Sequence, residues 1–138
     1  MGHIQGIYKI LEARQGAMVD YTIHCPQIAQ QARAGQFVHI RVPGFTLRRP
    51  ISICEVDKEK GTLRILFDIR GEGTRELAKA KAGDEIDVMG PLGNGFDLLE
   101  KDKKAVVVGG GIGVPPMLET AKHYGANATA VLGFRTKD

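Results

Sequence analysis

Apolar and polar side chains alternate through most of the first two-thirds of the chain, and many of them are β-branched or aromatic. A period of two is typical of strands that bury one face. Polar turn signals such as Asp57–Gly61 separate the segments. The pattern therefore predicts an all-β, six-stranded antiparallel barrel of the Greek-key kind. Its strands are expected at residues 6–15, 18–25, 36–42, 50–56, 61–69 and 84–90.

One helix is expected to interrupt these strands, over residues 73–83. Leu77 and Ala80 have helical spacing there, and Gly83 is a typical helix stop. The stretch Gly90–Lys104 is rich in glycine and then in charge, which suits a connection between domains. We therefore predict a barrel domain over residues 1–100 and an incomplete second domain over residues 101–138.

The pattern changes beyond this connection. Residues 105–110 form a continuous apolar run that ends in glycines, which is typical of a strand buried on both faces of a parallel sheet. A helix over residues 114–126 and a strand over residues 127–135 are expected to follow. This βαβ order predicts the start of an α/β nucleotide-binding domain. Two parallel strands bury little surface, so we expect roughly the last 35 residues to be loosely ordered alone or to be completed by another chain.

Composition excludes several classes of function. The net charge of the 138 residues is +3, and Lys and Arg are scattered among Asp and Glu, so we expect no nucleic-acid partner. No apolar run approaches the roughly 20 residues of a membrane span. Cys25 and Cys54 are far apart, and no secretion signal is visible, which favours a cytoplasmic protein with buried, reduced thiols. The histidines are scattered and are expected to be surface or packing residues rather than metal ligands: His3, His24, His39 and His123.

The glycine run Gly109–Gly113 is the first candidate site. A diphosphate could approach the backbone amides at the start of the following helix. The usual fingerprint G-x-G-x-x-G fails, because Pro116 stands in the third glycine's place. A tight turn without a ligand is the alternative. Arg135 lies near the position of a ribose-reading side chain, but a solvent-exposed basic residue is equally compatible with the pattern.

The predicted barrel carries a second candidate site. In Leu47–Ile53, Arg49 could bind a phosphate with paired N–H donors, and Ser52 could hydrogen-bond to a polar ring. In Arg70–Leu77, Thr74 is expected as a helix N-cap beside a second candidate anion site. Surface arginines and simple helix capping are the alternatives. Together with the glycine run, these stretches predict two nucleotides at a domain boundary.

Four stretches occur in an order similar to that of the ferredoxin–NADP reductase superfamily. They are Arg49–Ser52, Gly71–Thr74, Gly90–Phe96 and Gly109–Pro116. Within that superfamily, the chain most resembles the electron-transfer subunit of the heterodimeric, NAD-linked bacterial dihydroorotate dehydrogenase. The resemblance covers nearly the whole chain. The glycine loop is common to the superfamily, whereas "RRPISI" combined with "GPLGNGF" is much more specific.

The resemblance implies roles for matching positions. Arg49 would bind the FAD diphosphate, Gly73 and Thr74 would hold it from the other side, and Ser52 would lie near the reactive nitrogen of the flavin. Relatives often have tyrosine where this chain has Ile51, so stacking by a phenol ring is absent. The implied FAD-binding set is Arg49, Pro50, Ile51, Ser52, Leu66, Phe67, Asp68, Gly73 and Thr74. The implied NAD(H)-binding set is Gly109, Gly110, Gly111, Ile112 and Gly113.

The resemblance also implies an activity. The family relays electrons between NAD and a catalytic dihydroorotate dehydrogenase subunit in pyrimidine biosynthesis, as a heterotetramer, with no side chain acting as general acid or base. It uses a [2Fe–2S] cluster, which needs four protein ligands. This chain has two cysteines in all. We therefore interpret it as C-terminally truncated and not active alone. A related NAD(P)H–ferredoxin, hydrogenase or sulfide-linked reductase subunit is one alternative, and a non-catalytic docking module is another.

Overall fold

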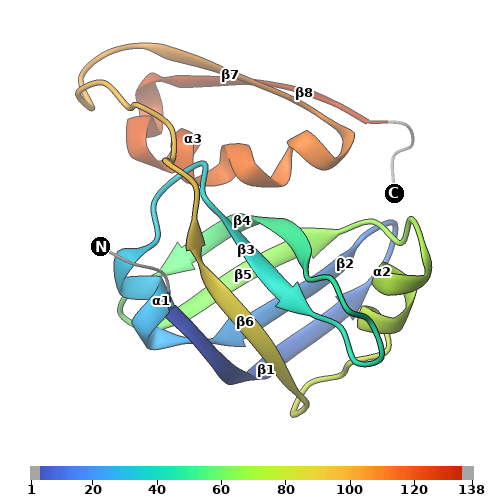
Figure 1. The fold of residues 1–138 in the computed structure, drawn as a ribbon. Coiled ribbons are helices and arrows are strands. Elements are labelled where there is room, and N and C mark those ends of the chain that lie inside the picture. Colours follow the sequence, from blue (N-terminus) through green and yellow to red (C-terminus); the bar gives the residue numbers. More distant parts are fainter. Residues whose placement is uncertain (1–3, 135–138) are drawn as a thin grey trace.

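The computed structural model describes residues 4–134, and six of its strands close into a barrel (Figure 1). The strands are β1 (Ile4–Gln15), β2 (Val19–His24), β3 (Phe37–Arg41), β4 (Arg49–Asp57), β5 (Thr62–Phe67) and β6 (Glu85–Leu92). Around the barrel they follow the order β1-β2-β5-β4-β3-β6, and every neighbouring pair is antiparallel. The prediction of a six-stranded antiparallel barrel is confirmed.

Alternation along the strands fills the inside of the barrel. On β5, Leu63, Ile65 and Phe67 are buried, whereas the residues between them are half-buried. The ring of Tyr21 from β2 packs edge-to-face on Phe67, with ring centroids 5.6 Å apart. Burial of each such side chain contributes roughly 1.5–3 kcal/mol to folding. The barrel interior is therefore a continuous apolar core.

Two short helices lie beside the barrel, and both differ from expectation. Helix α1 (Pro26–Gln31) was not predicted. It begins with Pro26 and buries Ile28 and Ala29, but Cys25 at its N-cap makes no side-chain capping bond. Its sequence therefore lacks the N-cap side chain that usually marks a helix start, and only Pro26 marks it.

Helix α2 (Glu72–Leu77) is shorter than the predicted helix over residues 73–83. The hydroxyl of Tyr21 lies 2.7 and 2.8 Å from the carbonyl oxygens of Leu77 and Ala80, which share its one proton. The N–H of Lys81, which a longer helix would direct at Leu77, donates to Asp84 Oδ2 instead. The long-range bond from Tyr21 and the local bond to Asp84 therefore end the helix before its sequence pattern ends.

The remaining elements form a βαβ unit. Strands β7 (Ala105–Gly110) and β8 (Ala128–Gly133) pair in parallel, as expected. The predicted helix over residues 114–126 is divided into the 3-10 turn η2 (Pro115–Met117), helix α3 (Leu118–Tyr124) and the 3-10 turn η3 (Gly125–Asn127). Figure 1 shows η2 and α3 between the β7–β8 sheet and strand β4 of the barrel.

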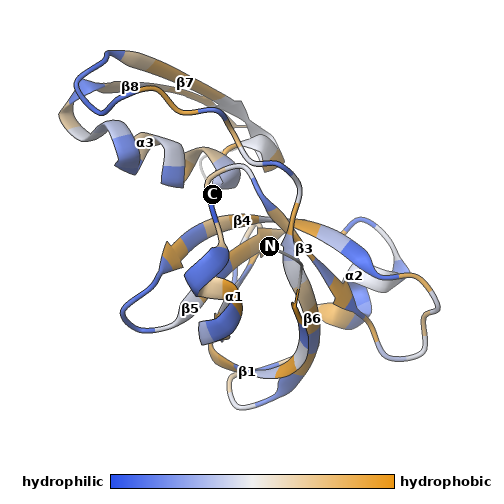
Figure 2. Cartoon of the chain, turned by 60° about the vertical axis from the view of Figure 1, so that its left-hand side comes forward, coloured by the Kyte–Doolittle hydropathy of each residue, from blue (hydrophilic) through white to orange (hydrophobic). Residues whose placement is uncertain are grey.

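In the described residues β7 is buried on one face only, although its apolar run is typical of a strand buried on both faces. Val107 is 5% exposed, but Val106 and Val108 are 67% and 66% exposed. Within residues 4–134, helical segments cover only one face of this sheet, and the hydrophobic residues of β7 and β8 are visible in Figure 2. A continuous apolar run shows that a strand can be buried on both faces, not that a second layer covers it.

A connection without regular structure leads from β6 to β7. Three hydrogen bonds attach it to the βαβ unit. The N–H of Leu99 donates to the Tyr124 hydroxyl at 2.9 Å, His123 Nε2 lies 2.8 Å from the Leu99 carbonyl oxygen, and Asn127 Nδ2 donates to the Lys101 carbonyl at 3.0 Å. The domain boundary at residue 100 stays a prediction.

Across residues 4–134, no helix has both the length and the apolar composition that a membrane crossing requires.

Candidate functional site

Arg49 is the first residue of β4, and its guanidinium group is held on two sides. Nη1 donates to the carbonyl oxygen of Leu47 at 2.7 Å, and Cζ lies 5.2 Å from the centroid of the Phe45 ring. The second contact has cation–π geometry. Within residues 4–134, Arg49 forms no ion pair with a carboxylate. The structure thus holds a positive charge in place without neutralising it.

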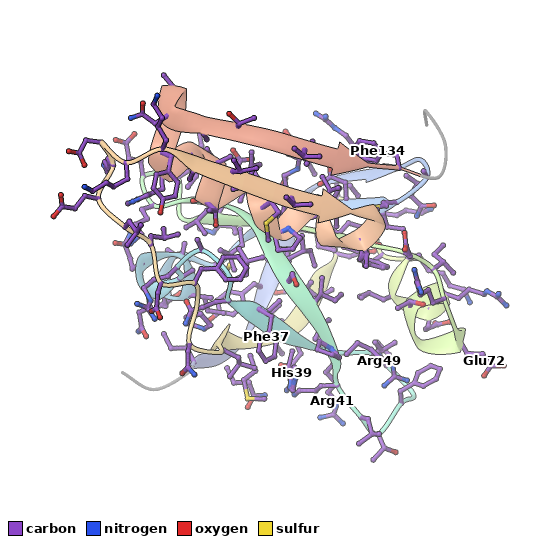
Figure 3. All side chains as sticks on the ribbon, turned by 90° about the horizontal axis from the view of Figure 1, so that it is seen from above. Phe37, His39, Arg41, Arg49, Glu72 and Phe134 are labelled. Carbon is purple, nitrogen blue, oxygen red and sulfur yellow. The ribbon has the colours of Figure 1, made fainter. Side chains whose placement is uncertain are left out.

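The third side of this guanidinium group rests on Gly73 of α2. A Cβ atom at Gly73 would lie 2.6 Å from Nη2 and 2.8 Å from Cζ of Arg49, closer than real Cβ atoms approach. Only glycine therefore allows the guanidinium to lie against the backbone here. Figure 3 shows Arg49 and Glu72, the first residue of α2, at the same end of the barrel. The fold brings together two stretches that the sequence marked separately.

The neighbouring Arg48 has a different role. Its Nη2 forms a 2.9 Å ion pair with Asp87 of β6, in which both side chains are about one-fifth exposed, and its Nη1 donates to the carbonyl oxygen of His39 at 3.2 Å. Arg48 therefore ties β3, β4 and β6 together. Of the two adjacent arginines, only Arg49 is available to an anion.

Thr74 organises the start of α2 from inside the first turn. Gly71 is the N-cap, so the expectation of Thr74 as N-cap is wrong by three positions. The hydroxyl of Thr74 accepts hydrogen bonds from the N–H groups of Arg70 (2.8 Å) and Gly71 (3.1 Å), and it donates to the Gly71 carbonyl at 3.1 Å. Its hydrogen-bonding capacity is therefore used to shape the loop that packs against Arg49.

The predicted FAD-binding residues of β4 divide between its two faces. Pro50 and Ser52 are exposed on the outside of the barrel, whereas Ile51 and Ile53 face the core. Ser52 is paired with Phe37 of β3, which Figure 3 shows in line with His39 and Arg41. A serine hydroxyl here is free to meet a ligand outside the barrel, but the side chain of Ile51 is 6% exposed and packs inward.

The same division holds around the end of β5. Leu66 and Asp68 are half-buried, and Asp68 forms an ion pair with Arg70 at 3.2 Å. Phe67 is 3% exposed and packs on Tyr21 in the core. A cofactor outside the barrel would therefore meet the side chains of Leu66 and Asp68, but only the main chain of Phe67.

A cleft of about 1290 Å³ separates this face of the barrel from the βαβ unit. It is large compared with ordinary small-molecule sites of roughly 300–1,000 Å³. Its walls include two predicted residues from the barrel and two from the glycine loop: Leu66, Asp68, Gly111 and Ile112. Arg49, Ser52, Gly73 and Thr74 are not among its lining residues. The predicted residues therefore form two groups, one at the Arg49 end and one in the cleft.

The glycine loop makes a sharp turn between β7 and η2. A Cβ atom at Gly109 would lie 2.9 Å from the carbonyl oxygen of Gly113, so the loop folds back directly on β7. Gly111 has φ +53°, a conformation that favours glycine. Nothing lies within 4 Å of a Cβ built at Gly110 or Gly113. The loop therefore combines a tight inner turn with an open outer surface.

Comparison with known proteins decides the family. A model of the oxidoreductase FAD-binding domain matches residues 12–96, which is more than half of the chain. The chain belongs to the oxidoreductase FAD-binding domain family.

Within this FAD-binding domain family, curated relatives agree with the resemblance that the sequence predicted. The chain is 53% identical to the dihydroorotate dehydrogenase B (NAD(+)) electron transfer subunit of Streptococcus mutans, over 78% of this chain and 45% of the relative. It is 50% identical to that of Fusobacterium nucleatum, over 75% of this chain and 43% of the relative. The chain thus spans less than half the length of these relatives, and the predicted resemblance is confirmed for that part.

A solved structure agrees with the fold. The structure of an NADH-dependent reduced ferredoxin–NADP oxidoreductase, described in connection with flavin-based electron bifurcation, matches 96% of this chain and 50% of its own chain. The TM-score is 0.86 and the identity is 36%. The FAD-binding barrel and the start of the nucleotide-binding domain therefore occur together in both proteins.

Charges in the cleft of this FAD-binding domain are largely compensated. Arg64 forms a 2.9 Å ion pair with Asp20, which is the largest cause that raises its pKa, and Arg70 is paired with Asp68. Arg49 differs from these arginines, because no carboxylate neutralises it within the described part of the chain. An anionic group is expected to bind at Arg49 rather than at the paired arginines.

The cysteines of the chain do not fit an iron–sulfur cluster. Cys25 and Cys54 are both buried, as expected, and neither is in a disulfide. Burial raises the pKa of Cys25 to about 12 and that of Cys54 to about 11, so both thiols stay protonated at neutral pH. No group of three or more His, Cys, Asp or Glu side chains within residues 4–134 could hold a metal ion. His3 and Arg135 lie outside the described residues.

The structure adds residues that the sequence did not indicate. The turn between β1 and β2, Gly16–Met18, lines the cleft opposite the glycine loop, together with Cys54, Val114 and Phe134. Phe45 was missed as a contact of Arg49. The only signal for Phe45 in the sequence was its position, four residues before Arg49. The β1–β2 turn gave none, because its place depends on how the barrel closes.

Proposed function

We propose that this chain is the flavin-carrying part of an electron-transfer subunit that serves a dihydroorotate dehydrogenase. The observation that carries the proposal is the Arg49–Gly73 contact. It holds an uncompensated guanidinium group against a helix start where an added Cβ would displace it. A diphosphate needs such a fixed, bidentate cation. The membership of the FAD-binding domain family supports FAD as the group that brings this diphosphate.

We assign the flavin end of the cofactor to the outer face of β4 and the end of β5. The exposed Ser52 hydroxyl is suited to donate a hydrogen bond to a ring nitrogen, and Leu66 and Asp68 border the same face. Pro50 adds a rigid, exposed edge, whereas Ile51 and Phe67 support the site from the core. Thr74 contributes by shaping the α2 loop rather than by a free hydroxyl. When bound, FAD supplies the exchange of a hydride with a nicotinamide and the transfer of single electrons.

We assign the glycine loop to a nicotinamide nucleotide. The open surfaces of Gly110 and Gly113 allow the backbone to approach a ligand, Gly109 and Gly111 permit the turn, and Ile112 projects from the loop with 41% exposure. Across the cleft lie Leu66 and Asp68 of the barrel. In this arrangement the residues of the chain bring the two nucleotides together in one cleft and leave the path between them open. No side chain is needed as a general acid or base.

The proposal extends to the setting of the whole protein. Relatives are named as electron transfer subunits of dihydroorotate dehydrogenase B, which supports a catalytic dihydroorotate dehydrogenase subunit as partner. We further propose a heterotetramer and a cytoplasmic role in pyrimidine biosynthesis, as the resemblance implies. The [2Fe–2S] cluster expected of the family does not fit this chain, which has two buried cysteines where such a cluster needs four ligands. Cluster chemistry is therefore no part of the proposal for these residues.

The absorption spectrum of the purified chain tests the proposal. A yellow protein that releases FAD on denaturation, or a colourless one that takes up FAD stoichiometrically, is the expected result. A chain that stays colourless after incubation with FAD would contradict it and would favour a docking module without a flavin. Uptake of FMN in place of FAD would remove the role assigned to Arg49, because FMN has no diphosphate.

A further inference from the structure

The barrel and the βαβ unit meet along the second half of β4. The first half of this strand, Arg49–Ser52, pairs with β3. Among the described residues, Glu55–Asp57 pairs only with β5. The N–H of Val56 donates to Oε2 of Glu119 on α3, at 3.2 Å. A carboxylate of the βαβ unit therefore takes the position that a neighbouring strand would occupy on this edge of the barrel.

Lys122, one turn further along α3, completes the contact. Its Nζ lies 3.0 Å from Glu119 Oε2 and 3.3 Å from Glu55 Oε2. Burial lowers the pKa of Lys122, but hydrogen bonds to Glu119 and Glu55 outweigh this effect and raise it. Arg64 of β5 lies 3.5 Å from the other oxygen of Glu55. We call the contacts among Val56, Glu55, Glu119 and Lys122 the β4–α3 clamp.

The β4–α3 clamp lies close in the chain to the glycine loop. The 3-10 turn η1 (Gly111–Gly113), η2 and α3 follow one another with only Val114 between them. Pro115 and Leu118 line the cleft together with Cys54 of β4, so apolar packing adjoins the polar contacts. Because this segment is short and helical, fixing Glu119 and Lys122 also fixes where the glycine loop stands relative to β4.

We propose that Glu119 and Lys122 are positioning residues that set the distance between the glycine loop and the flavin face of the barrel. The part of this inference that concerns the flavin rests on the proposed function. Solvent-exposed ion pairs add little to stability, and the side chains of Lys122 and Glu55 are 47% and 37% exposed. The hydrogen bond to the Val56 N–H is directional and comes from a carboxylate that is only 19% exposed. The clamp therefore specifies geometry more than it adds stability.

Two readouts on the FAD-loaded 138-residue chain test the proposal. The first is amide hydrogen exchange at Val56, and the second is quenching of flavin fluorescence by acrylamide. In Glu119→Ala we expect Val56 to exchange at least tenfold faster and the quenching constant to rise at least twofold. The FAD dissociation constant should change by less than twofold, because Glu119 lies outside the cofactor-binding set. Lys122→Met keeps the Val56 bond and should give smaller changes in the same direction.

Tyr124→Phe is the matched control. It removes one hydrogen bond of the same helix, from the Leu99 N–H in the connection between β6 and β7, rather than a bond to β4. This variant should leave Val56 exchange and flavin quenching within twofold of the wild type. Equal effects of Glu119→Ala and Tyr124→Phe would overturn the proposal, since they would show only a loss of stability. Unchanged Val56 exchange in both Glu119→Ala and Lys122→Met would also overturn it.

The two proposals fail in distinguishable ways. If the chain takes up no FAD, the proposed function fails, and exchange at Val56 still decides whether the clamp exists. If FAD binds but Glu119→Ala leaves quenching unchanged, the positioning role fails and the flavoprotein assignment stands. If Glu119→Ala does not fold, the exchange and quenching of Lys122→Met decide the question on their own.

Discussion

The barrel and the βαβ unit contain similar β-branched side chains but bury them to very different extents. Ile65 of the barrel is fully buried, as are most inward-facing residues of its six strands. In the βαβ unit, Val106 and Val108 are about two-thirds exposed, and Val107 is the only buried residue of β7 other than Gly109. A closed barrel provides an interior for every strand, whereas a two-stranded sheet provides only the face that α3 and η2 cover. The difference in burial between these β-branched residues therefore comes from the number of layers that cover each sheet.

Buried polar groups show the same contrast. Tyr21 in the barrel is fully buried, and its hydroxyl reaches two carbonyl oxygens at the end of α2. Thr120 in α3 is 8% exposed, and its Oγ1 has no hydrogen-bond partner among the described residues. Burying a hydroxyl without a partner costs free energy, whereas a paired hydroxyl fixes the elements it joins. The barrel is therefore the better satisfied of the two regions.

Truncating matched apolar residues should give the largest difference between the two regions. Ile65→Ala is expected to lower the free energy of unfolding by about 3 kcal/mol, because it leaves a cavity in a closed core. Val106→Ala should cost less than about 0.5 kcal/mol, because the side chain is mostly in water. Urea denaturation followed by circular dichroism measures both. If Val106→Ala lowered the free energy of unfolding as much as Ile65→Ala, the outer face of the β7–β8 sheet would have to be covered.

The buried tyrosine predicts a loss of stability at high pH. Burial raises the pKa of Tyr21 from 10.0 to about 12, so the folded state favours the neutral phenol. The stabilisation is complete below pH 10 and is lost as the pH rises from 10 to 12. It amounts to about 2 to 3 kcal/mol, because each pKa unit corresponds to about 1.4 kcal/mol.

Tyr21→Phe isolates this effect from that of the cysteines, whose pKa values are also raised. Wild type and variant should lose stability to the same extent below pH 10, and between pH 10 and 12 the wild type should lose more. Unfolding free energies measured across this range test the difference. Parallel curves for the two proteins would show that Tyr21 does not titrate with folding.

Two glycines, one from each region, should differ in how much an added methyl group affects FAD binding. Gly73→Ala places a Cβ against the Arg49 guanidinium and should weaken FAD binding about tenfold, which corresponds to about 1.4 kcal/mol. Gly113→Ala adds a Cβ in open space and should change FAD binding by less than twofold. Titration of FAD into the two variants measures this. If Gly73→Ala bound FAD normally, the close Arg49–Gly73 contact would not matter to the site.

The smallest expected effect has the opposite sign. Thr120→Val replaces a buried hydroxyl without a partner by a methyl group of similar size, and should raise the free energy of unfolding by about 1 kcal/mol. Urea denaturation measures the change, with Thr129→Val on the exposed side of β8 as the control. A loss of stability in Thr120→Val would show that the hydroxyl has a partner after all.

The sequence predicted the barrel because its evidence is local. Strand β5 alternates apolar and polar residues, and the Asp57–Gly61 turn connects it to β4, so short-range patterns were sufficient. Helix α1 was missed because Cys25 provides no cap, and α2 was overextended because Tyr21, far away in the chain, binds its last carbonyl groups. Both errors come from interactions, or the lack of them, that no local pattern records.

The site shows a similar limit. The sequence marked Arg49 and Gly73 as belonging to two separate stretches, and the closure of the barrel brings them into contact. It did not distinguish Arg48 from Arg49 by geometry, because the partner of Arg48 is Asp87 on a strand that follows much later in the chain. It also placed Ile51 beside the flavin, whereas the alternation of β4 turns that side chain into the core. The candidate residues were readable from the sequence, whereas the contacts between them depend on how the barrel closes.

The FAD affinity of Arg49→Ala tests the central claim most directly, with Arg41→Ala, an exposed arginine of the neighbouring strand β3, as control. Hydrogen bonds to a charged group contribute about 1.5–3 kcal/mol, so the dissociation constant of Arg49→Ala should rise by about tenfold to a hundredfold. That of Arg41→Ala should stay within twofold of the wild type. If Arg49→Ala binds FAD as tightly as the wild type, the diphosphate is held elsewhere and the assignment of the site to Arg49 is wrong.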